Sequence, residues 1–404
     1  MIGPNALAWV LAALTMLAPF CVDAYLPAFA SIATSLAASP IEVQHTLTLY
    51  MLSFAAMLLW HGALSDAYGR RNIVLVSLSV FVLATLGCAL AQNIEQLWAF
   101  RVLQGLSAGA GVVVGKAIIR DVYSDSQAVR VMSLVTMIFS IAPALAPIIG
   151  GWIVTWSDWR AVFLFVLVYA LVLLAYCQMR LPETLLRSKR QPFTPRFLLL
   201  SYVAIFRSPL FQFKTGALAF NFAGLFLYVA ASPVFITRHL GLGVDQFAWQ
   251  FVPAVAGMFL GSLAANRVAG KIEVQRQIAL GYACMLGAAL FNVGYHLFFP
   301  PALPWSVTPL FFYTFGMAAV APAGTLLVMD LFPNNRGLMA SCQTFTLTML
   351  ATVVGAVIAP ALSGSVLWLA LGQLGMALVG LLLWMGARRY RRRHPMPAGA
   401  AGLA

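Results

Sequence analysis

Two charged residues stand inside otherwise apolar runs, and they are where this sequence could do chemistry. Asp23 lies in the run 17–27 and Arg101 in the run 95–105. Withdrawal from water favours the neutral form of a carboxylic acid, whereas a nearby guanidinium favours the ionised form. A balance of the two leaves an acid able to exchange a proton in the physiological range. We predict such proton exchange at Asp23, paired with Arg101; a permanently ionised pair that only orients helices is the alternative.

A charged tight loop covers residues 62–71, between two long apolar segments. It contains two glycines that permit a sharp turn, one carboxylate and two arginines: Gly62, Asp66, Gly69, Arg70 and Arg71. Soluble proteins have little need of this combination beside a pair of apolar helices. The loop therefore indicates a membrane transporter.

A proline- and glycine-containing stretch covers residues 142–151. It includes Pro143, Pro147, Gly150 and Gly151. Prolines in a helix permit a kink, and glycines allow a neighbouring helix to approach closely. The stretch suits a hinge or a seal between bundles, and a merely kinked helix is the alternative.

The elements that must position these residues are helices in a lipid bilayer. Of 404 residues, 62% are hydrophobic and 9% are charged, and the mean hydropathy is +0.91. A water-soluble domain of this length could not carry that composition without aggregating. The net charge of +13 falls in a few short loops instead of covering one face, so no nucleic-acid partner is expected.

Enzyme and metal chemistry find little support in the sequence. The five cysteines lack Cys-x-x-Cys spacing and the five histidines are scattered, so we expect no metal site. No nucleophile and base stand together near an end of an apolar run. We predict that the protein is not an enzyme.

A spanning helix needs roughly 20 mostly apolar residues, because its backbone must satisfy its own hydrogen bonds in hydrocarbon. The sequence predicts an all-α membrane protein with twelve spans. They cover residues 8–32, 43–65, 72–91, 96–118, 131–155, 159–180, 211–236, 246–268, 275–298, 305–330, 338–361 and 365–387. Most lysines and arginines then fall in the loops on the side of the N-terminus, which predicts that both termini are cytoplasmic.

A charged stretch around residue 190 divides the chain into halves. We predict an N-terminal six-helix bundle over 1–182, a cytoplasmic linker over 183–208, a C-terminal six-helix bundle over 209–387 and a basic cytoplasmic tail over 388–404. The prolines and charges of the linker predict an exposed, weakly structured segment. The tail, with five arginines in 388–393, is expected to bind anionic lipid headgroups.

Aromatic and weakly polar side chains within the spans are candidates for the wall of a substrate cavity. Such walls bind lipophilic molecules through contact area and a few polar contacts. Ordinary helix packing is the alternative for each of them. The candidates are Tyr25, Gln104, Asn221, Tyr228, Tyr313 and Gln343.

Four of these strings, in this order, resemble motifs of the twelve-helix drug:proton antiporter family of the major facilitator superfamily. They are Asp-Ala-Tyr-Leu-Pro at 23–27, the loop 62–71, Arg-Val-Leu-Gln-Gly at 101–105 and the stretch 142–151. The run 23–27 and the Arg-Asp pair at 120–121 are most similar to the bicyclomycin/chloramphenicol-resistance (Bcr/CflA-type) branch. The resemblance covers the first half in detail and the second half by helix count.

The resemblance implies a major facilitator fold and proton-coupled antiport that exports small lipophilic or cationic drugs by alternating access. The proton gradient would be the energy source, with no cofactor, in a monomer in the bacterial inner membrane. Asp23 and Arg101 would couple the proton, the loop 62–71 would form a cytoplasmic gate, and the stretch 142–151 would mark exchange instead of uptake. Ala146 departs from the family, where glycine usually precedes Pro147. A proton-linked metabolite or nucleoside carrier of the same fold therefore stays open as an alternative.

Overall fold

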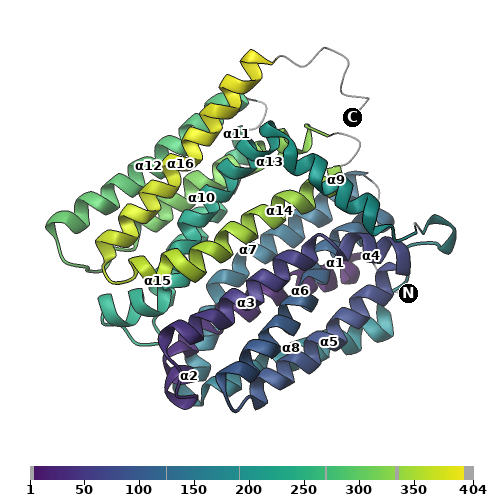
Figure 1. The fold of residues 1–404 in the computed structure, drawn as a ribbon, viewed down its shortest axis with the longest axis horizontal. Coiled ribbons are helices and arrows are strands. Elements are labelled where there is room, and N and C mark those ends of the chain that lie inside the picture. Colours follow the sequence, from purple (N-terminus) through teal and green to yellow (C-terminus); the bar gives the residue numbers. More distant parts are fainter. Residues whose placement is uncertain (1–3, 124, 191, 269–270, 333–335, 395–404) are drawn as a thin grey trace. The chain divides into compact units, whose positions relative to one another are not determined.

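The computed structural model describes residues 4–123, 125–190, 192–268, 271–332 and 336–394. These residues form helices joined by short connections, without a strand among them (Figure 1). The chain divides into two compact units. Unit 1 comprises Met1–Thr194 and Val244–Ala248, and unit 2 comprises Pro195–Gly243 and Trp249–Ala404.

Unit 1 is a bundle in which α3 and α5 pack on α6, α8 packs on α5, and α1 packs on α7 (Figure 1). Its elements are α1 (Pro4–Asp23), η1 (Leu26–Ala28), α2 (Phe29–Ser35), α3 (Pro40–Leu58), α4 (His61–Tyr68), α5 (Arg70–Leu90), α6 (Ile94–Val122), α7 (Asp125–Trp156), α8 (Trp159–Arg180) and η2 (Arg187–Lys189).

Unit 2 is built around α10, which packs on α13, α14 and α16, while α12 packs on α13 and α16. Its elements are α9 (Pro195–Arg207), α10 (Pro209–Val234), η3 (Phe235–His239), α11 (Ala248–Val268), α12 (Val274–Phe298), α13 (Thr308–Met329), α14 (Arg336–Val353), η5 (Val354–Ile358), α15 (Ala359–Leu362) and α16 (Val366–Arg393).

Local sequence signals explain where several helices begin. Ser39 and Glu42 form a reciprocal cap at the start of α3, in which the Glu42 carboxylate accepts from the Ser39 N–H at 2.7 Å. Such a box satisfies two N–H groups that have no partner within the helix. The side chain of Asn93 accepts from Gln96 N–H at 2.9 Å and starts α6 in the same manner.

Ten helices in the described residues are long and apolar enough to span a membrane, or eleven if the bent pair α3 and α4 forms one span. The two helices of that pair meet at a bend of 48°. Helix α7 coincides with the remaining predicted span, 131–155. The apolar run within it, Ile141–Trp156, is shorter than the other spans. The predicted all-α membrane fold is confirmed.

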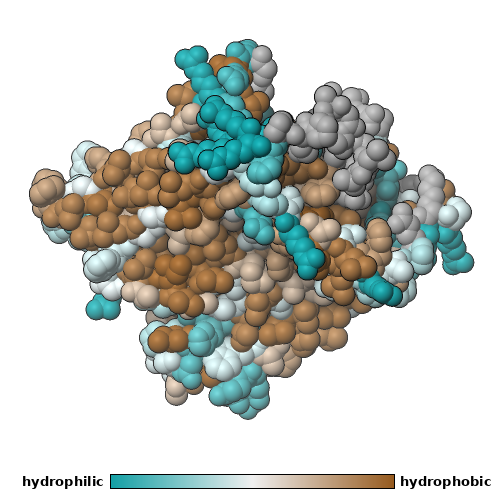
Figure 2. All heavy atoms as spheres, turned by 45° about the horizontal axis from the view of Figure 1, so that its top comes forward, coloured by the Kyte–Doolittle hydropathy of each residue, from teal (hydrophilic) through white to brown (hydrophobic). Residues whose placement is uncertain are grey.

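The surface of the molecule matches that environment. The face drawn in Figure 2 is largely hydrophobic. Large apolar side chains of α5 are exposed at a helical spacing, namely Val76, Val80, Leu83, Leu86 and Leu90. In water such a stripe would promote aggregation, so it faces lipid.

The expectation of a weakly structured linker is wrong for residues 195–207. These residues form α9, because Leu198, Tyr202 and Ile205 recur on one face and are buried against α10 and α14. The expectation rested on the prolines and charges of the preceding residues. Those features stop before the apolar periodicity of α9 begins.

Candidate functional site

The turn at Gly69 connects α4 to α5 and requires glycine. Its φ of 98° lies in a region that other residues rarely adopt. A Cβ there would also overlap the carboxylate of Glu183 and the guanidinium of Arg190. The turn therefore combines an unusual backbone with close approach of the chain that follows α8.

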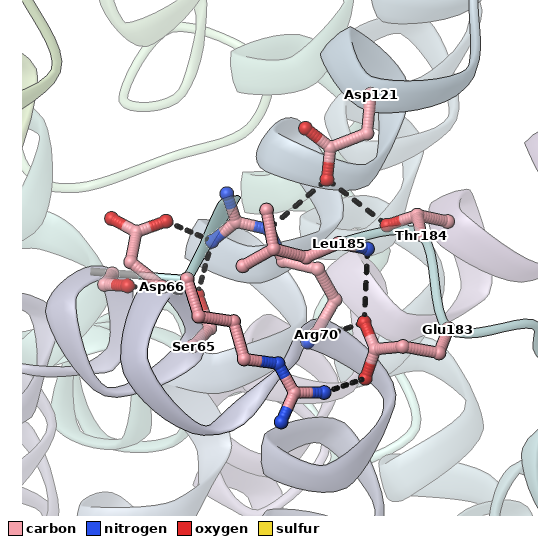
Figure 3. A network of polar contacts seen from close by, with 9 residues as sticks. Ser65, Asp66, Arg70, Asp121, Glu183, Thr184 and Leu185 are labelled. Atoms are coloured by element: carbon pink, nitrogen blue, oxygen red, sulfur yellow. Dashed lines mark hydrogen bonds and ion pairs between the residues drawn. The ribbon is translucent and has the colours of Figure 1, made fainter. Parts of the chain in front are cut away.

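Arg70 is the centre of a polar cluster at this turn (Figure 3). Its Nη1 lies 2.5 Å from Asp66 Oδ1 and donates to Ser65 Oγ at 2.6 Å. Its Nε donates to Asp121 Oδ2, at the end of α6, at 3.1 Å. One largely buried guanidinium thus joins the ends of α4 and α6 to the start of α5.

The segment after α8 completes this cluster, as Figure 3 shows. Glu183 Oε1 accepts from the backbone N–H of Arg70 at 3.0 Å and caps the start of α5. Its other oxygen lies 3.5 Å from Arg190 Nη2, and Thr184 Oγ1 donates to Asp121 at 3.0 Å. A carboxylate suits this position because the first turn of a helix carries free N–H groups and partial positive charge.

The other two predicted members of the loop lie at its edges. Arg71 Nη2 donates to the backbone oxygen of Gln178 in α8 at 2.7 Å. Gly62 O accepts from Ser65 Oγ at 2.8 Å, and a Cβ on Gly62 would meet Val113 at an ordinary 3.5 Å. Sequence reasoning missed Ser65, Glu183 and Thr184 as partners in this cluster.

Arg101 is fully buried and held by backbone oxygens and aromatic rings. Its Nη1 donates to Cys21 O at 3.2 Å and to Gln104 Oε1 at 3.0 Å. The carbon of the guanidinium lies 4.8 Å from the ring centre of Tyr25 and 4.4 Å from that of Tyr50. A cation between two aromatic faces is stabilised by their negative faces.

Tyr25 and Gln104, which we predict to line a cavity, both contact the guanidinium of Arg101. Tyr25 is buried and its hydroxyl lies 2.5 Å from Thr46 Oγ1. Gln104 is buried too, and its Nε2 donates to Thr85 Oγ1 at 2.8 Å, which orients Oε1 toward Arg101. Both side chains position the guanidinium in this structure.

Asp23 ends α1 near the middle of the span Leu7–Ser35 and is 6% exposed. No ion pair joins Asp23 to Arg101, two described residues for which we predicted one. Arg101 Nη2 lacks a hydrogen-bond partner in the described part of the chain. Arg101 binds the backbone oxygen of Cys21, two residues before Asp23 in the chain, and not the Asp23 carboxylate.

The stretch 142–151 lies in α7, and its glycines allow close backbone contact. A Cβ on Gly150 would overlap the carbonyl oxygen of Ala24, next to Asp23. A Cβ on Gly151 would overlap the oxygen of Val244. Pro143 and Pro147 lie inside the same helix. The stretch thus contacts the chain just after α1, next to the acid at the end of that helix.

The four cavity candidates of unit 2 lie in its interior. Asn221 Nδ2 donates to Tyr282 OH at 3.1 Å, and Tyr313 OH donates to Asn221 O at 3.0 Å. Tyr228 OH accepts from Asn292 Nδ2 at 2.8 Å. All of these side chains are buried among α10, α12 and α13.

Gln343 is the fourth candidate and lies in α14. Its Nε2 donates to Thr325 Oγ1 at 2.9 Å, and its Oε1 is buried without a partner among the described residues. No group of His, Cys, Asp and Glu in the described ranges could hold a metal ion.

Comparisons with known proteins match this architecture. The sequence model of the Major Facilitator Superfamily matches residues 11–356. The chain is 33% identical over 289 residues to a Bicyclomycin resistance protein homolog of Haemophilus influenzae, covering 70% of this chain and 73% of that protein. It is 30% identical over 315 residues to Multidrug resistance protein D of Escherichia coli, covering 78% of each.

A solved structure supports the fold. A bacterial homolog of the human lysosomal transporter Spinster, in an inward-facing conformation, superposes with a TM-score of 0.69 at 15% identity, over 98% of this chain and 100% of that one. The superfamily model covers most of the chain, and the helices and the fold agree with it. The chain belongs to the Major Facilitator Superfamily, as a multi-pass transporter of the inner membrane.

Proposed function

We propose that this protein exports small lipophilic or cationic drugs in exchange for protons. The single observation that carries the proposal is Asp23, a carboxylic acid in the middle of a span without an ion pair to Arg101. The names of two relatives, a bicyclomycin resistance protein homolog and a multidrug resistance protein, support drugs as the substrate class.

The exchange follows from one acid with two competing partners. A proton from outside binds a carboxylate oxygen of Asp23 and neutralises it, which releases a cationic or polar group of the substrate. Substrate arriving from the cytoplasm favours the ionised acid, and the proton leaves to the cytoplasm. The two events share one coupling free energy. Each proton contributes about 1.4 kcal/mol per pH unit and about 2.3 kcal/mol per 100 mV.

Arg101 is held against the backbone of the segment that carries this acid and does not bind the carboxylate. The oxygen of Cys21 and the rings of Tyr25 and Tyr50 hold the guanidinium in place. Its Nη2, which has no hydrogen-bond partner among the described residues, is available to an acceptor on a substrate or to Asp23 in another conformation. Tyr25, Gln104, Asn221, Tyr228, Tyr313 and Gln343 remain our candidates for the cavity wall in states where these helices move.

The cluster around Arg70 suits a cytoplasmic gate in a cycle of alternating access. Its ion pairs involve partly exposed carboxylates, and such pairs are worth little individually, so they bias an equilibrium without locking it. Arg70→Gln should slow export about tenfold in everted vesicles, because Asp66 and Asp121 lose a shared partner. Arg276→Gln, at an exposed site of α12, is the matched control. Unchanged export in Arg70→Gln would remove the gate from the proposal.

The distribution of basic residues supports cytoplasmic termini. Arg388, Arg389 and Arg391 at the end of α16 are exposed, as are Arg187 and Arg196 around the connection between the halves. We propose that the tail meets anionic headgroups on that side. The transporter acts as a monomer without a cofactor in this proposal.

The decisive experiment compares Asp23→Asn with the intact protein in everted vesicles, with a pH-sensitive dye and panels of lipophilic cations, phenicols and nucleosides. Asp23→Asn should abolish substrate-driven proton release while the protein still folds. Asp245→Asn, at an exposed acid outside the helices, should leave release unchanged. Uphill export by Asp23→Asn under an imposed acid gradient would overturn the proton role. A response to nucleosides alone would replace drugs by metabolites.

A further inference from the structure

Helix α9 has one buried face and one exposed apolar face. Leu198, Tyr202 and Ile205 are buried against α10 and α14. On the opposite side, Phe197 is 61% exposed and Leu200 is 62% exposed, and Leu199 and Val203 are exposed as well. The segment is thus apolar on the side that its own unit leaves uncovered.

Two arginines bracket this exposed face. Arg196, Leu200, Val203 and Arg207 are spaced by four, three and four residues, which aligns them on one stripe of a helix. Both arginines are exposed, and no Asp or Glu occurs between Glu183 and Asp245. Nothing acidic in the neighbouring sequence therefore competes for these cations.

The place of α9 in the chain brings this stripe to the membrane surface. Only Ser208 separates the end of α9 from the start of α10, which is a candidate span from Pro209 to His239. Figure 1 shows α9 running across the direction of α10 and α14. A helix that joins the first residue of a span and runs across its direction is oriented to lie along the surface of a bilayer.

We propose that the exposed face of α9 inserts into the headgroup region of the bilayer and binds anionic phospholipids through Arg196 and Arg207. Amphipathic helices with basic residues and a broad apolar face lie in this plane, with the apolar side chains at the acyl boundary. Charge complementarity selects lipid over a protein partner, since the stripe offers cations at its ends and only hydrocarbon between them. With cytoplasmic termini, the lipids belong to the inner leaflet.

The first experiment places a fluorescent probe on the stripe of the full-length protein in vesicles of phosphatidylethanolamine and phosphatidylglycerol. Leu200→Cys is labelled with NBD in a Cys284→Ser background, because the other four cysteines are buried. Ser188→Cys, exposed in the preceding connection, is the matched control. Nitroxide-labelled lipids should quench the probe at 200 strongly and the probe at 188 weakly, and aqueous iodide should do the reverse.

Either of two results would overturn the insertion. Iodide quenching at 200 as strong as at 188 would place the face in water. Protection of the probe at 200 from both quenchers would mean that protein covers it.

The second experiment tests the arginines by varying the fraction of phosphatidylglycerol. Each of Arg196→Gln and Arg207→Gln should raise the fraction that gives half-maximal nitroxide quenching by about fivefold, the effect of one basic residue at an anionic surface. Arg238→Gln, an exposed basic residue of η3, should leave it unchanged. An unchanged midpoint in both α9 variants would overturn anionic lipid binding. Neither readout needs a substrate, so the result is independent of the proposed export.

Discussion

The buried polar groups of the two units differ in kind. Buried within spans, away from their ends, the described residues of unit 1 include a carboxylic acid and a guanidinium, Asp23 and Arg101. Unit 2 holds amides and hydroxyls there, with Asn292 donating to Tyr228 OH and to Gln373 Oε1. Its buried Lys214 lies near the start of α10 and donates to Leu327 O. Isolated charge in a membrane is expensive and is retained where it functions.

We infer from this difference that the two units contribute differently to transport. Charges that change with protonation can drive a conformational equilibrium, while neutral hydrogen bonds mainly fix packing. We therefore expect variants of unit 1 to alter proton coupling. Matched variants of unit 2 should alter stability and leave proton coupling unchanged.

After the complete loss expected from Asp23→Asn, the largest effect is expected from Arg101→Lys. Lysine keeps the positive charge but lacks the planar guanidinium that donates to Cys21 O, Gln104 and Thr46 O at the same time. Loss of these charge-assisted bonds, each worth about 1.5–3 kcal/mol, should reduce drug-driven proton release at least about tenfold. Everted vesicles give the rate, and size-exclusion chromatography checks that the variant still folds. A rate equal to that of the intact protein would mean that a positive charge at position 101 is enough for proton coupling, whatever its hydrogen bonds.

An intermediate effect is expected from Gly150→Ala, which forces a methyl group against Ala24 O. Such overpacking typically costs about 1–3 kcal/mol and should lower the unfolding temperature in detergent. Gly375→Ala in α16 of unit 2 is the control, since nothing lies within 4 Å of the added carbon. It should be neutral or slightly stabilising, because alanine favours helix over glycine. Equal unfolding temperatures would refute close packing at Gly150.

The smallest effect is expected from Tyr228→Phe. The change removes the acceptor of the Asn292 amide, which keeps Gln373 Oε1 as a partner. The expected loss is about 1 kcal/mol of stability. The pH profile of transport should not move, because no charged group is altered. A shifted profile would break the contrast between the units and give Tyr228 a part in proton coupling.

The helices were predictable because their signal is local. Apolar length located the spans, and the bend between α3 and α4 still falls inside the predicted span 43–65. The turn at Gly69 was predictable because charged residues and glycines lie there between two long apolar segments. Residue types at Asp23 and Arg101 identified them as unusual within apolar helices without any knowledge of the fold.

The partners of those residues could not be predicted in the same manner. Glu183 caps α5 across 113 residues of sequence, and Asp121 meets Arg70 across 51. Arg101 takes uncharged oxygens and rings instead of the expected carboxylate. Such choices depend on how helices pack, and backbone oxygens at a helix break carry no signature in the side-chain sequence.

The contact between Gly150 and Ala24 has a mechanical consequence. Two main chains that touch leave no side chain between them to absorb a displacement. A bend in α7 that displaces Gly150 should therefore also displace Ala24, the residue after Asp23. We therefore expect gain of a proton at Asp23 and motion of this proline-containing helix to be parts of a single step.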